Sequence, residues 1–192
     1  AIALHGDLEQ RERDEAIIRF SSKCVSILVA TDVAARGLDI EQLDLVINFQ
    51  FSRDIDTYTH RIGRTGRAGN KGLACSIFIE KEGYKLAAIA ESLGVDVEPS
   101  ALPSYELLQQ PTYYPKYACI QIEGGKRQKV RAGDILGALT SNKELDGKQI
   151  GKIKIFDNSA YVAVDAKIVK KALRKLNNEK MKGRSFRARW LK

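Results

Sequence analysis

Basic side chains and glycines alternate in residues 60–67, which read His-Arg-Ile-Gly-Arg-Thr-Gly-Arg. Three arginines and a histidine in so short a segment repel one another unless an anion neutralises them. Arg64 and Arg67 are three positions apart, so both guanidinium groups could reach one phosphate and match the charge of a phosphoryl transition state. The alternative is a solvated basic helix end that the macrodipole favours. The flanking glycines favour a phosphate site.

A second candidate site is the segment 31–39, Thr-Asp-Val-Ala-Ala-Arg-Gly-Leu-Asp, which directly follows an apolar run. Ligands of open α/β sheets bind at the carboxyl ends of strands. Gly37 permits a close backbone approach, and Asp39 is placed to accept a hydrogen bond from a ribose hydroxyl. Taken alone, such a segment is more often explained by Asp32 capping a short helix. Together with the arginine segment downstream, it indicates a nucleotide site.

The third cluster is a run of cations at residues 126–131, Lys-Arg-Gln-Lys-Val-Arg, which follows two glycines and precedes a helix that Asp134 helps to begin. Cations beside a helix N-terminus form a plausible phosphate clamp for nucleic acid. A charge run is more often a solvated loop. Binding is favoured here because of the charge of the whole surrounding region. The RNA contacts that we predict from this run are Lys126, Arg127, Lys129 and Arg131.

Charge is distributed unevenly along the 192 residues. The net charge is +8. Residues 1–110 carry 12 Lys and Arg against 17 Asp and Glu, a net charge of −5, whereas residues 111–192 carry 20 against 7, a net charge of +13. A small segment with so many cations attracts a polyanion such as nucleic acid, or an anionic membrane surface.

The four prolines mark a division of the chain, because all of them lie between Pro99 and Pro115. Proline lacks an amide donor and fixes φ, so this stretch cannot form a continuous helix or a central strand. The charge changes sign there as well. We therefore predict a domain over residues 1–94, a linker over residues 95–115 and a basic domain over residues 116–192.

Residues 1–94 alternate apolar runs with amphipathic stretches, which is typical of a parallel α/β sheet. Strands are expected at 1–4, 25–30, 45–49 and 73–79. Asp7 is expected to cap a first helix with Gln10 completing the cap, Asp54 to begin a second helix, and residues 82–93 to form a third.

Residues 116–192 predict the order βαββαβ, a split βαβ arrangement of the ferredoxin type. The strands are expected at 117–122, 150–156, 160–164 and 185–191, and the helices at 132–140 and 166–176. Val169, Ala172 and Leu176 lie on one face of the second helix, opposite lysines that include Lys175. Along the last strand, Arg187 and Arg189 are expected to face outward.

The order and spacing of three motifs resemble those of DEAD-box RNA helicases: Leu4-His5-Gly6-Asp7 with Gln10-x-x-Arg13, then residues 31–40, then residues 60–67. The resemblance covers about residues 1–95 and implies a RecA-like second lobe. It assigns the RNA backbone to Gly6, Gln10, Arg13, Thr31 and Gly37, the ATP ribose to Asp39, the γ-phosphate to Arg64 and Arg67, and coupling between lobes to His60 and Arg61. For His60 the alternative is simple packing at the surface of the lobe.

Two motifs of the complete family are absent from this sequence: the phosphate loop G-x-x-x-x-G-K-[ST] and the Asp-Glu-Ala-Asp motif. The resemblance implies ATP with Mg as cofactor, held mainly by a first lobe that this chain lacks. That N-terminal RecA-like lobe is therefore an expected partner. We expect that the chain alone does not hydrolyse ATP.

The βαββαβ order resembles an RNA-recognition motif (RRM), whose sheet stacks bases on aromatic side chains. Only Tyr161 fits that aromatic pattern, and Tyr161 could equally cover the sheet. Lys152 and Lys154 are further candidate RNA contacts. The overall prediction is an α/β RecA-like parallel-sheet lobe followed by a small α+β, RRM-like domain.

Residues 129–135, Lys-Val-Arg-Ala-Gly-Asp-Ile, make the basic domain similar to the RNA-binding domain of the DbpA subgroup. This similarity implies tethering to a hairpin of large-subunit ribosomal RNA, contact with the pre-ribosomal particle, and a role in late ribosome assembly in the cytoplasm. Two alternatives remain: a non-catalytic RNA-binding assembly protein, or a fragment of a DNA-directed superfamily-2 helicase.

Cysteine usage and hydropathy point to an intracellular chain without a metal site. Cys24, Cys75 and Cys119 lie far apart with no C-x-x-C pair, which suits a reducing compartment better than a disulfide framework or a zinc site. No apolar run approaches the ~20 residues that span a bilayer. We expect no membrane partner.

Overall fold

The computed structural model describes residues 1–35, 40, 43–52, 54–66 and 71–192. Contacts between Cα atoms divide the chain into two compact units, one of residues 1–35 together with 112–192 and one of residues 36–111. The predicted domain boundaries at 94 and 116 remain a prediction, because this division groups the first 35 residues with the basic domain.

The first 35 residues form a parallel strand pair, as the alternation of apolar and amphipathic stretches predicts. Strand β1 pairs in parallel with β2, so that Leu4 lies opposite Ala30. The predicted cap of the first helix is wrong: the helix begins after Glu9, whose amide donates to the Glu12 carboxylate at 3.0 Å. Asp7 lies near His5 instead, at 3.5 Å. The elements are β1 (Ile2–Leu4), α1 (Gln10–Ser21), β2 (Leu28–Ala30) and α2 (Asp32–Ala35).

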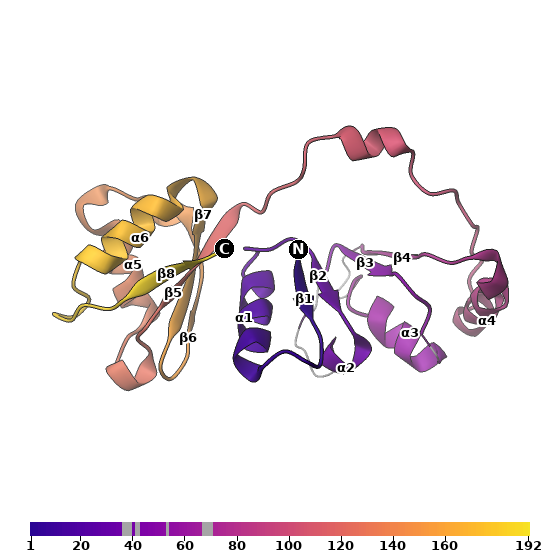
Figure 1. Ribbon diagram of the computed structural model, residues 1–192, viewed down its shortest axis with the longest axis horizontal. Helices are drawn as coiled ribbons and strands as arrows, with labels where there is room; N and C mark the ends of the chain where they lie inside the picture. The colour runs from indigo at the N-terminus through magenta and orange to yellow at the C-terminus, as the bar shows by residue number, and fades with distance from the viewer. Residues whose placement is uncertain (36–39, 41–42, 53, 67–70) are drawn as a thin grey trace. The chain divides into compact units, whose positions relative to one another are not determined.

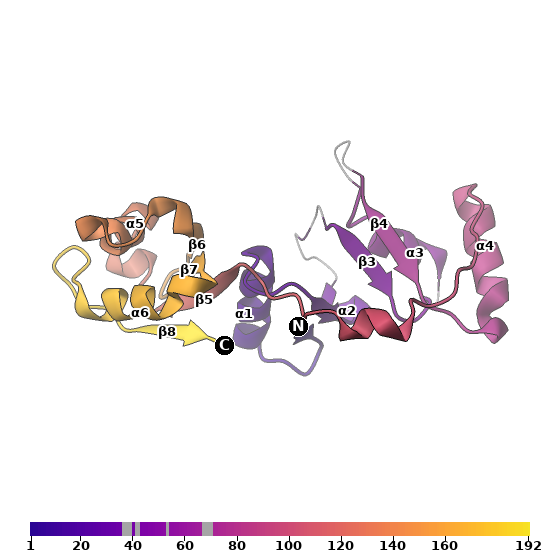
Figure 2. The ribbon, with the colours of Figure 1, turned by 90° about the horizontal axis from the view of Figure 1, so that it is seen from above.

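The second unit contains another parallel pair, β3 with β4, and helix α3 contacts β3 (Figure 2). Asp54 caps α3 as predicted, because its carboxylate accepts from the Thr57 amide at 2.7 Å. Helix α4 ends at Leu93 and is capped by Gly94, whose φ of +63° is a left-handed conformation that glycine adopts without strain. The elements are β3 (Leu45–Asn48), α3 (Ile55–Ile62), β4 (Leu73–Ser76), η1 (Glu80–Glu82), α4 (Gly83–Leu93) and η2 (Tyr105–Gln109).

Residues 117–191 form the predicted βαββαβ domain. Its four strands make one antiparallel sheet in the order β6-β7-β5-β8, and helices α5 and α6 cover one face of that sheet (Figure 1). The core between sheet and helices contains Ile120, Ile135, Leu139 and Val162, each with no exposed surface. The elements are β5 (Tyr117–Ile122), η3 (Lys126–Gln128), α5 (Ala132–Thr140), η4 (Ser141–Lys143), η5 (Gly147–Gln149), β6 (Ile150–Ile155), β7 (Ala160–Asp165), η6 (Ala166–Ile168), α6 (Val169–Asn178) and β8 (Ala188–Leu191).

Helix α6 buries the predicted apolar stripe and also one lysine. Val169, Ala172 and Leu176 are buried, but Lys175 is buried too, contrary to the prediction that it lies on the solvated face. Its ammonium group donates to the Ser141 carbonyl and lies 3.2 Å from the Glu179 carboxylate. The Ser141 hydroxyl and this lysine together hold the pKa of Glu179 below its usual value. A long aliphatic stem explains how a lysine on the buried side still reaches polar partners.

The sheet face opposite α5 and α6 is covered within the first unit by helix α1 and the residues that follow it. Ile18 and Cys24 pack with Cys119 and Tyr161 of the sheet. Lys154 donates to the Ser21 hydroxyl at 2.8 Å, and Arg189 pairs with Glu15 at 3.4 Å. This face is therefore a packed surface, apolar at its centre and polar at its edge.

Candidate nucleic-acid interface

Four residues predicted to face RNA gather where β1 and β2 end. The Thr31 amide donates to the Leu4 carbonyl at 3.2 Å, which places the ends of the two strands side by side. Arg13 reaches back from α1 to the His5 carbonyl at 3.4 Å, and Gln10 bonds to Asp14 at 2.8 Å on the same helix. Gly6 and Thr31 are exposed, and Gly6 has nothing near its Cα on the side of a missing Cβ. The carboxyl ends of the parallel strands thus offer an open edge with two anchored polar side chains.

Arg61 is fixed by the strand that precedes its helix. Its guanidinium donates to the Asn48 side-chain oxygen at 3.2 Å and to the Gln50 carbonyl at 2.8 Å. Asn48 is buried, with 2% of its surface exposed, and its amide donates in turn to the Ser76 hydroxyl at 3.3 Å. The network joins α3 to both strands of the pair. His60, its neighbour on α3, is exposed.

Arg64 follows α3 in a turn that main-chain bonds hold. Its carbonyl accepts from the Leu43 amide at 3.0 Å, and the next residue, Thr65, donates its hydroxyl to the Leu43 carbonyl. The Arg64 side chain is partly exposed beside this turn. The other predicted nucleotide contacts, Gly37, Asp39 and Arg67, lie outside the described residues. Arg64 is therefore the one predicted γ-phosphate contact that the structure places.

The basic run of residues 126–131 is held in position by its main chain. The Lys126 and Arg127 amides donate to the carbonyls of Phe156 and Asp157, at 2.8 and 2.9 Å, in the loop between β6 and β7. A Cβ on Gly125 would lie 2.1 Å from the Phe156 carbonyl oxygen, so only glycine allows this approach. The side chains of Lys126, Arg127, Lys129 and Arg131 are all exposed. The run thus presents four cations on a fixed backbone.

A second basic segment joins this run at the start of α5. Lys182 donates to the Asp134 carboxylate at 3.0 Å and to the Lys129 carbonyl at 3.0 Å. The Asp134 carboxylate also accepts from the Arg131 amide at 2.8 Å, as expected of a residue in the first helical turn. The hydrogen bond from Lys182, followed by that from the Arg131 amide, lowers the pKa of Asp134. Residues 126–131 and 180–187 together carry eight Lys and Arg.

The remaining predicted RNA contacts of this domain occupy different environments. Tyr161 is buried, with 6% of its surface exposed, and its hydroxyl accepts from the Gln121 amide at 3.2 Å. Lys152 is exposed, whereas Lys154 is partly buried and bonds to Ser21. The burial of Tyr161 leaves its ring without an exposed face on which a base could stack.

Among the described residues, no three His, Cys, Asp or Glu side chains lie together where they could hold a metal ion. No helix in the described parts of the chain is both long enough and apolar enough to cross a membrane.

Two known protein families match the N-terminal and the C-terminal part of the chain. Residues 1–69 match the helicase conserved C-terminal domain, and residues 119–189 match the DbpA RNA binding domain. Over these two ranges the chain is similar to the C-terminal part of a DbpA-subgroup RNA helicase. The RecA-like lobe followed by an RRM-like domain, predicted from the motifs, is confirmed by these two matches.

Two curated relatives carry the name ATP-dependent RNA helicase DbpA. That of Escherichia coli is 45% identical over 192 residues, covering 100% of this chain and 42% of its own length. That of Bacillus subtilis is 33% identical over 204 residues, covering 96% of this chain and 43% of its own length. The chain therefore spans less than half the length of these relatives. Among solved structures, the E. coli DEAD-box protein SrmB bound to regulator of ribonuclease activity A is 42% identical, with a TM-score of 0.45, over 58% of this chain and 64% of that chain.

Sequence reasoning missed several side chains of this interface. Asn48 connects Arg61 to the strands. The sequence feature that could have indicated this role is a polar residue at the end of an apolar strand. Lys182, Arg184 and Phe186 lie close to the basic run, although they are far from it in sequence. No local pattern could have revealed that proximity, because the chain folds back between the two segments.

Proposed function

We propose that this chain provides the helicase C-terminal lobe and the RNA-binding domain of an ATP-dependent RNA helicase that remodels ribosomal RNA locally during assembly of the large ribosomal subunit. The basic domain tethers the enzyme to a specific ribosomal RNA hairpin, and the lobe acts on the RNA nearby. The observation that carries the proposal is the basic run of residues 126–131, which is rigidly presented beside the N-terminus of α5 in a segment with a net charge of +13. The names of the two curated relatives support the ATP-dependent activity.

In this proposal the lobe contributes cations to the nucleotide. ATP, when bound with Mg, supplies the free energy of phosphoryl transfer. Arg64 contacts the γ-phosphate, and a guanidinium suits that role because it donates to two oxygens and keeps its charge. Arg64 suits a phosphate contact because the Leu43 amide holds the turn that positions it. We assign the metal ion to the other RecA-like lobe of the enzyme, as the resemblance to DEAD-box helicases implies.

RNA is held on the lobe by the open edge where β1 and β2 end. Arg13 and Gln10 are restrained by bonds to His5 and Asp14, so they lose little side-chain freedom when they contact a phosphate. Arg61 stays bonded to Asn48 and positions the helix that leads to Arg64. We place the protein in the cytoplasm, with the pre-ribosomal particle as its partner.

The test is binding of the chain to a large-subunit ribosomal RNA hairpin and to a scrambled hairpin of equal length, from low to physiological salt. Preference for the natural hairpin that survives physiological salt is expected if the domain is an address. Equal binding that collapses with salt would refute the ribosomal role and leave only phosphate neutralisation. A chain whose residues 116–192 are replaced by a neutral domain is the control and should lose the preference.

A further inference from the structure

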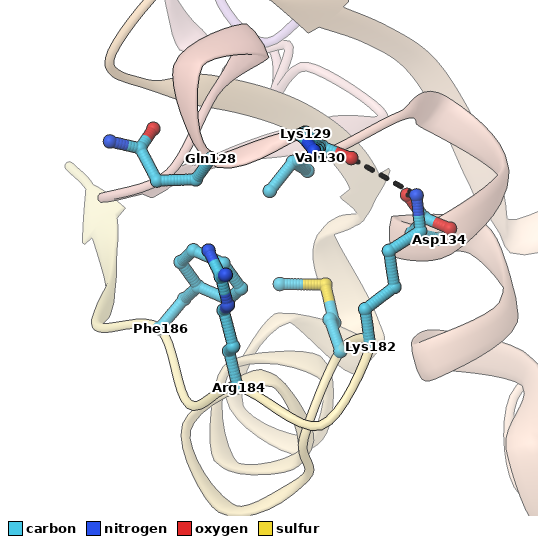
Figure 3. Close-up of a pocket in the computed structure, with 8 residues that line it drawn as sticks. Gln128, Lys129, Val130, Asp134, Lys182, Arg184 and Phe186 are labelled. Atoms are coloured by element: carbon cyan, nitrogen blue, oxygen red, sulfur yellow. Dashed lines mark hydrogen bonds and ion pairs between the residues drawn. The ribbon is translucent and has the colours of Figure 1, made fainter.

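The basic domain contains a small pocket between two segments that are distant in sequence (Figure 3). It lies between the turn that carries the basic run and the loop that leads into β8. Its volume is about 120 Å³. The residues around it are Gln128, Lys129, Val130, Asp134, Met181, Lys182, Arg184 and Phe186.

The interior of this pocket is apolar. Val130 and Met181 are buried, with 5% and 3% of their surfaces exposed, and belong to the core of the domain. Phe186 is partly exposed and packs against the same core. Its ring lies directly against Gly124, because a Cβ there would come within 2.3 Å of the ring. An aromatic ring and two aliphatic side chains therefore line a hollow that opens to solvent.

The rim of the pocket is cationic and held in place. Lys182 bridges the two sides through its bonds to Asp134 and to the Lys129 carbonyl (Figure 3). Met181 and Arg184 exchange two main-chain hydrogen bonds, at 2.9 and 3.1 Å, which close the loop. The pocket is therefore formed before any ligand arrives, which reduces the entropic cost of binding.

The size and chemistry of the pocket select the ligand class. Sites for small molecules and cofactors usually enclose ~300 Å³ or more. This pocket is smaller than such sites, so it can hold only one flat ring system and not a whole cofactor. An apolar ring site surrounded by cations fits a nucleotide, whose base is flat and whose phosphates are anionic. The usual alternative on an RRM-like sheet is not open here, because Tyr161 is buried.

We propose that one unpaired base of the RNA inserts into this pocket against Phe186, while the adjoining phosphates contact Lys129, Arg131 and Arg184. The proposal rests on the proposed RNA-binding function and specifies how part of the ligand is recognised. It predicts that the domain distinguishes an unpaired base from a bare ribose-phosphate backbone. A purely electrostatic surface makes no such distinction.

The experiment measures binding of the 192-residue chain to two hairpin RNAs that share one stem. One probe has a mixed-sequence loop, and the other has the same loop with abasic riboses. The wild-type chain is expected to prefer the first probe. Phe186→Leu should weaken binding to that probe about fivefold or more, the lower end of what one stacked base contributes, and leave the abasic probe unchanged. Phe186→Tyr, which keeps the ring, should behave as wild type.

Tyr114→Leu is the control. Tyr114 is an exposed aromatic residue, 79% exposed, that precedes β5 and does not line the pocket. It should bind both probes as the wild type does. Equal loss on both probes for Phe186→Leu, or no loss on either, would overturn the pocket assignment. Failure of the wild type to bind either probe would instead overturn the RNA-binding function itself.

Discussion

Removing the charge of the basic run at residues 126–131 is expected to change the salt dependence of RNA binding. The variant K126Q/R127Q/K129Q/R131Q removes four positive charges and keeps side chains of similar length. The structural bonds of these residues run through the main chain, to the Phe156 and Asp157 carbonyls and to Asp134. The fold should therefore tolerate all four changes.

The magnitude follows from the number of phosphates that these cations neutralise. All four side chains are exposed, so each can contact one phosphate. Each neutralised phosphate contributes roughly 0.7 to 0.9 to the slope of log K against log salt concentration, so losing four should flatten the slope by about 3. Over a fourfold rise in salt, that change corresponds to about a 60-fold difference in how far affinity falls.

The assay is a fluorescence anisotropy titration of a hairpin RNA at several salt concentrations. The control variant K167Q/K170Q/K171Q/R174Q removes the same net charge from exposed positions at and before helix α6. It should change the slope by much less than the first variant. If both variants flatten the slope equally, the cations of the whole domain act together and the assignment of the interface to residues 126–131 is refuted.

Two further predictions concern side-chain contacts of Asp134 and of two cysteines. Asp134→Asn should destabilise the chain near neutral pH, because the hydrogen bond from Lys182 lowers the pKa of the Asp134 carboxyl group. Such a carboxylate stabilises the fold above its unfolded pKa, and this contribution is lost as the pH falls through the lowered folded pKa. The difference in unfolding free energy should therefore begin to shrink below about pH 4 and disappear once the pH lies below the folded pKa. A difference that persists at lower pH would contradict this origin. The thiols of Cys24 and Cys119 form a hydrogen bond, which lowers the pKa of Cys24 and, with burial, raises that of Cys119; mild oxidation should therefore join these two cysteines within one chain. Peptide mapping by mass spectrometry checks the linkage, and oxidation that involves the exposed Cys75 alone would argue against the packing of α1 on the sheet.

The fold of the basic domain could be predicted closely because its local signals agree with one another. Strand β5 and helix α5 occupy the residues predicted for them, since a complete apolar strand and a helix with Asp134 in its first turn leave little freedom. Asp54 was predicted correctly for a similar reason. The first helix was predicted less well, because Glu12 provides the reciprocal bond that Gln10 was expected to make.

The candidate site was harder to predict because part of it depends on tertiary contacts. The motif residues Arg61 and Arg64 are recognisable from spacing alone, but the bonds that hold Arg61 come from Asn48 and Gln50 on another element. The pocket beside Phe186 depends on how a distant loop returns to the basic run. Periodicity reports which side of an element faces the core and carries no information about which distant loops become neighbours.

Because the basic run is attached through its main chain, its side chains can change in evolution without loss of its shape. Main-chain bonds and the close approach at Gly125 position residues 126–131, so the backbone contributes the shape and the side chains contribute the preference for a ligand. Substitutions among these exposed positions alter recognition without disturbing the core. New RNA preferences can therefore arise here one residue at a time, while a change at Gly125 disrupts the scaffold that every variant shares.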